Sequence, residues 1–183
     1  EPALMAAARL AAKTGVRLLA EVFPTRLERG AGLPYVERIA YLAELASVQL
    51  ADLDNLILID AKAPVSFFAY PGKQSYLVPD TCTVHTLASL EKLVRQVGAG
   101  ETAPVLQAAA CPGRPRGKFT AEKVCKAIGH LLPERAIIVD EAQTSGLMLS
   151  MMTRGAPRHD LITLTGGAIG QGDVGEIGLP ALI

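Results

Sequence analysis

The chain has 183 residues, of which 50% are hydrophobic and 20% are charged, and its 18 Lys and Arg residues balance its 18 Asp and Glu residues. This balance removes the electrostatic basis for binding nucleic acid or an anionic membrane. The absence of Trp and the scarcity of other aromatic residues argue against a platform that stacks bases, so a small polar ligand or a partner surface is the favoured target.

The first half of the chain alternates between helical and strand-like patterns. Apolar residues recur at helical spacing over residues 3–13, Gly15 supplies a stop, and residues 16–22 form a short apolar run typical of a buried strand. Further along, the pattern predicts a polar loop at 24–32, a helix at 33–53, strands at 55–61, 65–70 and 81–87, and a helix at 89–98. Strands that alternate with helices predict an α/β fold with a mainly parallel sheet.

The second half opens on a linker. Residues 99–119 crowd Gly, Pro and Arg together with neither a helical nor a strand period, and they separate a first domain at 1–98 from a second unit at 120–183. The second unit is predicted to hold a helix at 121–133 capped by Thr120, a strand at 136–142, a Met-rich helix at 145–155 and a strand at 161–167. Two strands are too few to close a core, so we expect this unit to be incomplete.

Cysteine usage and apolar runs bear on the cellular compartment. Cys82, Cys111 and Cys125 are far apart, with no CxxC pair and no neighbouring His, which fits neither a zinc site nor a disulfide framework. No apolar run reaches the ~20 residues of a membrane helix, and the first residues form a charged amphipathic helix rather than a signal peptide. We therefore expect a cytoplasmic protein. The chain opens inside a helical pattern without Met and closes soon after a glycine cluster, so we expect a piece of a longer polypeptide.

Several familiar motifs are absent or lack their context. Residues 170–175, GQGDVG, formally match the GxGxxG pattern of dinucleotide-binding turns, but the eight residues after them leave no room for the helix and acidic residue that the motif requires. There is no P-loop and no GxSxG nucleophile elbow. The histidines are isolated from other metal-type ligands and are expected to pack or to face solvent: His85 in a strand, His130 in a helix and His159 in a polar loop.

Two predicted strand ends carry the most informative residues. Residues 140–146, DEAQTSG, are small and polar where a strand gives way to a helix, and residues 165–172, TGGAIGQG, hold four glycines after the next strand. Ligands bind at the carboxyl edge of a parallel sheet, and the free N–H groups of a following helix attract anions. Taken alone, the first stretch is equally explained by a helix cap from Thr144 or Ser145. Because a second strand end of this kind lies in the same unit, we favour a single crevice formed by the two strand ends.

These stretches resemble a known family. The order AIIVDEAQTSG, then a Met-rich helix, then LITLTGGAIGQG resembles the start of the diphosphate-binding domain of thiamine-diphosphate-dependent enzymes of the acetolactate synthase large-subunit and benzoylformate decarboxylase group. The stretches ERGAGLPYVERIAY and DAKAPVSFFAYPGKQSYLVP are similar to the central domain of acetolactate synthase-like proteins. The resemblance covers nearly the whole chain up to Gly172 and implies an α/β protein in which a Rossmann-like central domain precedes an incomplete thiamine-diphosphate-binding unit.

The resemblance implies six cofactor-binding positions in two groups. They are Glu141, Gln143 and Thr144 in the first strand end, and Gly167, Ala168 and Ile169 in the second. In the family, the first group hydrogen-bonds the cofactor diphosphate, with its acid at the domain edge. The backbone of the second group meets the aminopyrimidine, and the apolar side chain at the isoleucine position props the cofactor in its bent shape.

The resemblance also implies partners and leaves gaps. It implies thiamine diphosphate and magnesium as cofactors, pyruvate or a related 2-oxo acid as substrate, and a homo-oligomer, dimer or tetramer, in the full-length protein. The family's magnesium loop and activating glutamate have no match here, so no catalytic or metal-binding residue is assigned. FAD binding stays open, because no residue identifies a flavin pocket.

The leading hypothesis is therefore a fragment of a thiamine-diphosphate-dependent carboligase or decarboxylase. Two alternatives remain: a non-catalytic nucleotide- or flavin-binding module, and a degenerate subunit of such an enzyme.

Overall fold

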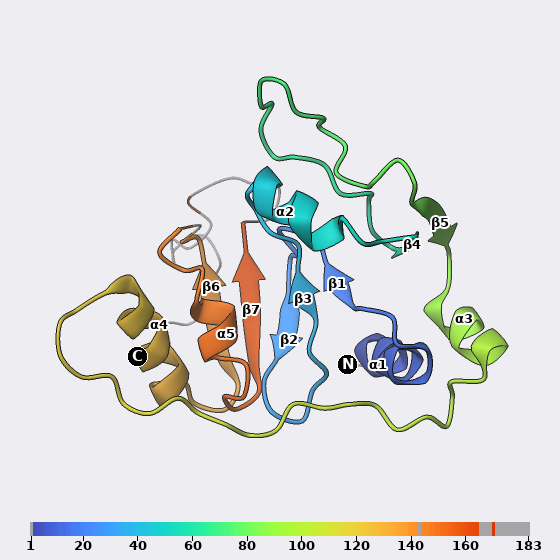
Figure 1. Cartoon of the computed structure of the whole chain (residues 1–183). Helices are drawn as coiled ribbons and strands as arrows, with labels where there is room; N and C mark the ends of the chain where they lie inside the picture. Colours follow the sequence, from blue (N-terminus) through green and yellow to red (C-terminus); the bar gives the residue numbers. More distant parts are fainter. Residues whose placement is uncertain (1, 143, 165–169, 171–183) are drawn as a thin grey trace. The chain divides into compact units, whose positions relative to one another are not determined.

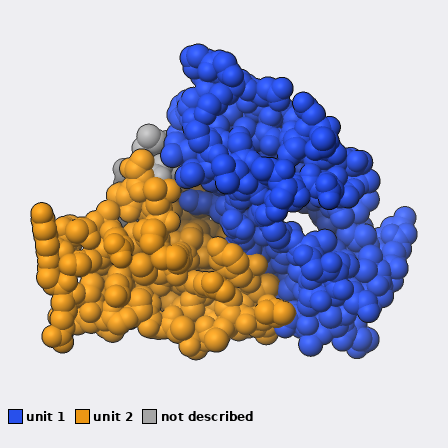
Figure 2. Space-filling model, viewed as in Figure 1, with its two compact units in different colours: residues 1–22, 36–104 blue, residues 23–35, 105–183 orange. Residues whose placement is uncertain are grey.

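The computed structural model describes residues 2–142, 144–164 and 170, and its helices alternate with short strands that pair mostly in parallel (Figure 1). The predicted α/β class is confirmed. The chain forms two compact units, one of residues 1–22 and 36–104 and the other of residues 23–35 and 105–183 (Figure 2). The domain boundaries at residues 98 and 120 stay a prediction. Every helix within the described residues is too short or too polar to cross a bilayer.

The first unit contains two separate parallel strand pairs. The strand β1 (Leu19–Ala20) pairs with β3 (Glu37–Arg38), and β4 (Asn55–Ile59) pairs with β5 (Thr83–Leu87). The helix α2 (Ala43–Leu50) lies between these pairs in the sequence.

A small helical core completes the first unit. The helix α1 (Pro2–Thr14) packs against α3 (Leu90–Val97), and Leu10, Val94 and Ala99 are buried at their contact. The hydroxyl of Ser89 caps α3 by accepting from the backbone N–H of Lys92, and Gly98 ends the helix in the left-handed region, as is common at helix C-termini.

The second unit is built on a three-stranded sheet in the order β2 (Leu27–Arg29), β7 (His159–Thr163), β6 (Ala136–Asp140). The β6–β7 pair is parallel and the β2–β7 pair is antiparallel. Along β7, His159, Leu161 and Thr163 are buried on one face of the sheet. The short helix α5 (Leu149–Met152) contacts β2, because the Arg29 guanidinium donates to the hydroxyl and the carbonyl of Ser150, both at 2.7 Å.

The helix α4 (Ala121–Leu131) packs against α5, and Thr120 caps it as predicted by accepting from the backbone N–H of Lys123. Gly129 lies at the contact. A Cβ atom on Gly129 would stand 2.1 Å from the carbonyl oxygen of Met152, so the two helices approach each other through bare backbone.

Three predicted elements are wrong, and two more are shortened: the strand at 16–22 to β1, and the helix at 145–155 to α5. The stretch at 24–32 is not only a loop, because residues 27–29 form β2, and Arg26 just before β2 forms ion pairs with Glu28 and with Asp160 of β7. The predicted helix at 33–53 is reduced to α2, because the side chain of Gln49 binds the backbone of Arg38 and Ala40 and holds them extended. In both cases tertiary pairing overrides the local pattern.

The predicted strand at 65–70 is instead a loop with one isolated bridge, between Val65 and Tyr76. Its aromatic residues pack on one another: the Phe67 and Phe68 rings lie 5.0 Å apart, and Tyr41 stands 5.4 Å from Phe67. The aromatic residues of this stretch therefore pack against one another outside any strand.

Candidate functional site

Two strands of the second unit end side by side. The last residue of β6, Asp140, is in register with the last residue of β7, Thr163. Both are buried, with 5% and 1% of their surface exposed. The Asp140 carboxylate accepts from the N–H of Ala142 at 3.0 Å, and the Thr163 hydroxyl donates to the carbonyl of Pro24 at 2.8 Å. Buried polar groups with partners fix the point at which each chain leaves the sheet, so the two strand ends that the sequence singled out do meet at one edge.

A direct contact joins two residues that follow these strand ends in the sequence. The backbone N–H of Gly170 donates to the Oε2 atom of Glu141 at 2.8 Å. Gly170 has a φ of 107°, a conformation that favours glycine. Glu141 thus couples the loop after β6 to the glycine segment after β7, a contact that the sequence did not predict.

Of the predicted cofactor-binding residues, Thr144 is the other one that the structure describes besides Glu141. Thr144 is exposed in the turn that follows Glu141. Four of the six predicted cofactor-binding residues lie outside the described residues: Gln143, Gly167, Ala168 and Ile169.

A helix cap does not explain the polar loop after β6. The following helix, α5, has Met148 at its N-cap position and no side-chain cap hydrogen bond, so neither Thr144 nor Ser145 caps it. Thr144 and Ser145 are both exposed, and within the described residues their backbone N–H groups have no hydrogen-bond partner. These N–H groups and hydroxyls are donors suited to anionic phosphate oxygens, so the loop fits a diphosphate.

Gly146 makes the loop compact. Its N–H donates to the carbonyl of Ala142 at 3.0 Å, and a Cβ atom on Gly146 would lie 2.4 Å from that carbonyl oxygen and 3.0 Å from Asp140 Oδ1. Only glycine fits in this turn without moving the backbone. The sequence signal for this role was the glycine at the end of DEAQTSG.

Cys125 supports the same loop from α4. Its thiol is 3% exposed and lies 3.5 Å from the carbonyl oxygen of Ser145. Burial, and secondarily the charge of Asp140, raise the pKa of this thiol, so it stays protonated and donates rather than acting as a nucleophile. Its spacing from other cysteines gave no hint of this contact.

His159 and Arg29 are buried polar residues at opposite positions of β7 and β2, where the sequence predicted loops. His159 is not in a polar loop: it begins β7 with 4% of its surface exposed, and it is in register with Arg29, also 4% exposed. Its Nδ1 atom lies 2.8 Å from the carbonyl oxygen of Pro157, so Nδ1 carries the proton, and Nε2 has no partner in the described part of the chain. Burial lowers the pKa of His159.

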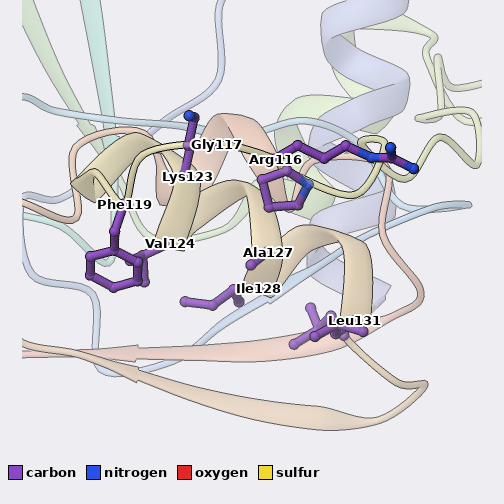
Figure 3. Close-up of a pocket in the computed structure, with 10 residues that line it drawn as sticks. Arg116, Gly117, Phe119, Lys123, Val124, Ala127, Ile128 and Leu131 are labelled. Carbon is purple, nitrogen blue, oxygen red and sulfur yellow. The ribbon is translucent and has the colours of Figure 1, made fainter.

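The larger of two hollows found among the described residues of the second unit lies away from the strand ends. It has a volume of about 510 Å³ and is formed by residues 115–119 and one side of α4. Phe119, Ile128 and Leu131 line its apolar floor, and the charged ends of Arg116 and Lys123 extend away from it (Figure 3). None of the described candidate residues lines this hollow. Within the described residues, no three His, Cys, Asp or Glu side chains gather to hold a metal ion.

Comparison with curated proteins gives one strong match. A protein of Mycobacterium tuberculosis (strain ATCC 25618 / H37Rv) named "Putative acetolactate synthase large subunit IlvX" is 51% identical to this chain over 184 residues. The match covers 97% of this chain and 36% of that protein, so the chain spans about a third of its relative's length. No family model matches, and no solved structure matches.

This identity, together with the α/β fold, supports a place among acetolactate synthase-like proteins. The resemblance that the sequence motifs suggested is thus supported at the level of the family.

Proposed function

We propose that the chain is part of an acetolactate synthase-like enzyme that uses thiamine diphosphate and acts on pyruvate or a related 2-oxo acid. The observation that carries the proposal is the joined strand ends: Asp140 and Thr163 end neighbouring parallel strands, and Glu141 bonds Gly170 across the two loops. The carboxyl edge of a parallel sheet is where ligands bind in α/β proteins, and the relative's name points to the same chemistry.

The residues of this site would bind and orient the cofactor. The exposed hydroxyls and N–H groups of Thr144 and Ser145 would donate to the diphosphate, and Asp140 and Gly146 hold the turn that presents them. Glu141 would fix the distance between this loop and the glycine segment. When bound, thiamine diphosphate supplies the electron sink that lets a 2-oxo acid lose carbon dioxide, and the protein contributes position.

The sequence resemblance assigns the remaining contacts. Gln143 would add a hydrogen bond to the diphosphate, the backbone of Gly167 and Ala168 would lie against the aminopyrimidine, and Ile169 would wedge the cofactor into its bent shape. No residue of this sequence is assigned to hold magnesium.

A titration of the full-length protein with thiamine diphosphate in the presence of magnesium tests the proposal. Replacing Thr144 by Val removes one hydroxyl donor at constant shape. A hydrogen bond to a charged group contributes about 1.5–3 kcal/mol, so we expect Thr144→Val to raise the dissociation constant by roughly 10-fold or more. Thr81→Val is the matched control, because Thr81 is an exposed threonine in a turn of the first unit.

Two outcomes would contradict the proposal. The first is no saturable binding of thiamine diphosphate by the full-length protein. The second is equal weakening by Thr144→Val and Thr81→Val, which would show that the loop after β6 is not the site. Flavin absorbance in the purified protein without thiamine diphosphate binding would instead favour a non-catalytic flavin-binding module.

A further inference from the structure

A second hollow in this unit shares no residue with the strand-end site. It has a volume of about 400 Å³ and lies between an extended segment at 105–110, Tyr35, and residues within and just after α5. Its rim carries apolar side chains that are exposed: Val105 is 78% exposed, Met151 54% and Leu106 42%. Exposed apolar side chains around a concave surface are typical of a binding site.

The backbone around this hollow is held by hydrogen bonds. Gln107 donates its N–H to the carbonyl of Leu33 and accepts from the N–H of Gly32, both at 2.9 Å. Ala110 donates to the carbonyl of Gly155 at 2.8 Å. A Cβ atom on Gly155 would lie 2.8 Å from the N and O atoms of Ala110, so the extended segment and the residues that follow α5 are in direct backbone contact. The walls of the hollow are therefore formed before any ligand arrives.

One cation lines the hollow, and two contacts orient it. The Nε atom of Arg154 donates to the side-chain oxygen of Gln107 at 3.0 Å, and its guanidinium carbon lies 5.0 Å from the centre of the Tyr35 ring. The two terminal nitrogens of Arg154 have no hydrogen-bond or ion-pair partner within the described residues. A guanidinium held by its Nε atom and by an aromatic ring loses less freedom when it binds a ligand.

Within the part of the chain that the structure describes, no acidic side chain lines the hollow beside Arg154. The other lining residues are apolar or neutral: Tyr35, Val105, Leu106, Gln107, Ala108, Ala110, Met151 and Gly155. A free pair of guanidinium nitrogens matches the two oxygens of a carboxylate. The apolar rim would take up a short hydrocarbon chain but offers no second cation for a more highly charged group.

We propose that this hollow is a binding site for a monocarboxylate with a short aliphatic chain, with Arg154 holding the carboxylate and Val105, Leu106 and Met151 contacting the chain. The inference is independent of the proposed function, because no residue of the strand-end site takes part. The guanidinium is exposed to water, which weakens ion pairs, so the site would bind in the millimolar range.

Titration of the full-length protein with isovalerate, followed by NMR or calorimetry, tests the assignment. We expect saturable binding, a loss of at least tenfold in affinity in Arg154→Gln, and a smaller loss in Arg154→Lys, which keeps the charge but not the fork of nitrogens. Tyr35→Leu should also weaken binding, because it removes the ring that positions Arg154. The matched control is Arg116→Gln, which removes an arginine that lines the larger hollow, and it should bind isovalerate like the wild type.

Several results would overturn the assignment. They are the absence of saturable binding, equal affinity in the wild type and Arg154→Gln, an equal loss in Arg116→Gln, and tighter binding of inorganic phosphate or of neutral 3-methylbutanol than of isovalerate. Circular dichroism and thermal unfolding of each variant show whether it is folded. Thiamine diphosphate binding should be unchanged in Arg154→Gln, so failure of this inference and failure of the proposed function are separate results.

Discussion

Gly129 offers a sharp test of how the second unit is packed. It lies within α4, where glycine costs about 0.5–1 kcal/mol relative to alanine, so local propensity predicts that Gly129→Ala stabilises the protein. The structure predicts the opposite. The new Cβ atom would stand 2.1 Å from the carbonyl oxygen of Met152, 2.8 Å from its carbonyl carbon and 3.0 Å from Cγ of Pro112.

The size of the effect follows from these distances. Two of the three atoms belong to the backbone at the end of α5, so no side chain can rotate away to relieve the clash. The helices must separate by roughly 1 Å, and overpacking of this kind costs about 1–3 kcal/mol. After the gain in helix propensity is subtracted, we expect Gly129→Ala to lower the free energy of unfolding by about 1–2 kcal/mol.

Urea unfolding of the full-length protein, with hydrogen exchange measured over α4, provides the assay. The matched control is Gly113→Ala, because a Cβ atom on Gly113 would meet nothing within 4 Å and its φ is not positive. That variant should be unchanged or more stable by about 0.4–1 kcal/mol. If Gly129→Ala is as stable as Gly113→Ala and exchange over α4 is not faster, the close contact between α4 and α5 is wrong.

Two further predictions concern charged and titratable groups in the same unit. Burial lowers the pKa of His159 in the folded state, so its contribution to stability is present above its unfolded pKa of about 6.5 and is lost as the pH falls below that value. The loss is at most about 1.4 kcal/mol per pH unit. His159→Gln should therefore make the free energy of unfolding less dependent on pH between 7 and 5.5, and an unchanged dependence would contradict this. Glu141→Ala removes the acceptor for the Gly170 N–H, and loss of a hydrogen bond of about 1 kcal/mol should speed hydrogen exchange of that amide by roughly fivefold. Glu141→Gln keeps an acceptor, so the Gly170 amide should exchange more slowly in this variant than in Glu141→Ala.

The local sequence pattern predicted an element correctly where the residues of that element alone determine its structure. The capping hydroxyl of Thr120 and the apolar side of α4 predicted that helix, and the apolar runs at 55–61 and 136–142 predicted β4 and β6, which are two residues shorter. The same reasoning failed for β2, which has only three residues and two of them charged. Its strand conformation comes from pairing with β7, more than 130 residues away along the chain, and no window of local sequence contains that partner.

The candidate site likewise has features that the sequence predicts and features that it does not. The position of the two strand ends could be predicted, because parallel strands that are neighbours must end at the same edge, and the register of Asp140 with Thr163 bears out that reasoning. The hydrogen bond from Gly170 to Glu141 could not be predicted, because the two residues are 29 positions apart and no local pattern relates them. The hollow lined by Arg154 could not be predicted either. Tyr35, Gln107 and Arg154 come from three segments that are separate in the sequence, and none of these segments has a pattern that indicates a binding site.

The two proposed sites differ in how the chain holds its ligand-binding groups, and this difference predicts how each responds to mutation. At the strand ends, buried Asp140 and the close contact of Gly146 set the turn that carries Thr144, so changes in the supporting residues should weaken thiamine diphosphate binding together with stability. In the other hollow, an exposed arginine is positioned by one hydrogen bond and one ring. Surface contacts of this kind contribute little to folding, so Arg154 variants should lose the carboxylate while the unfolding transition stays where it was.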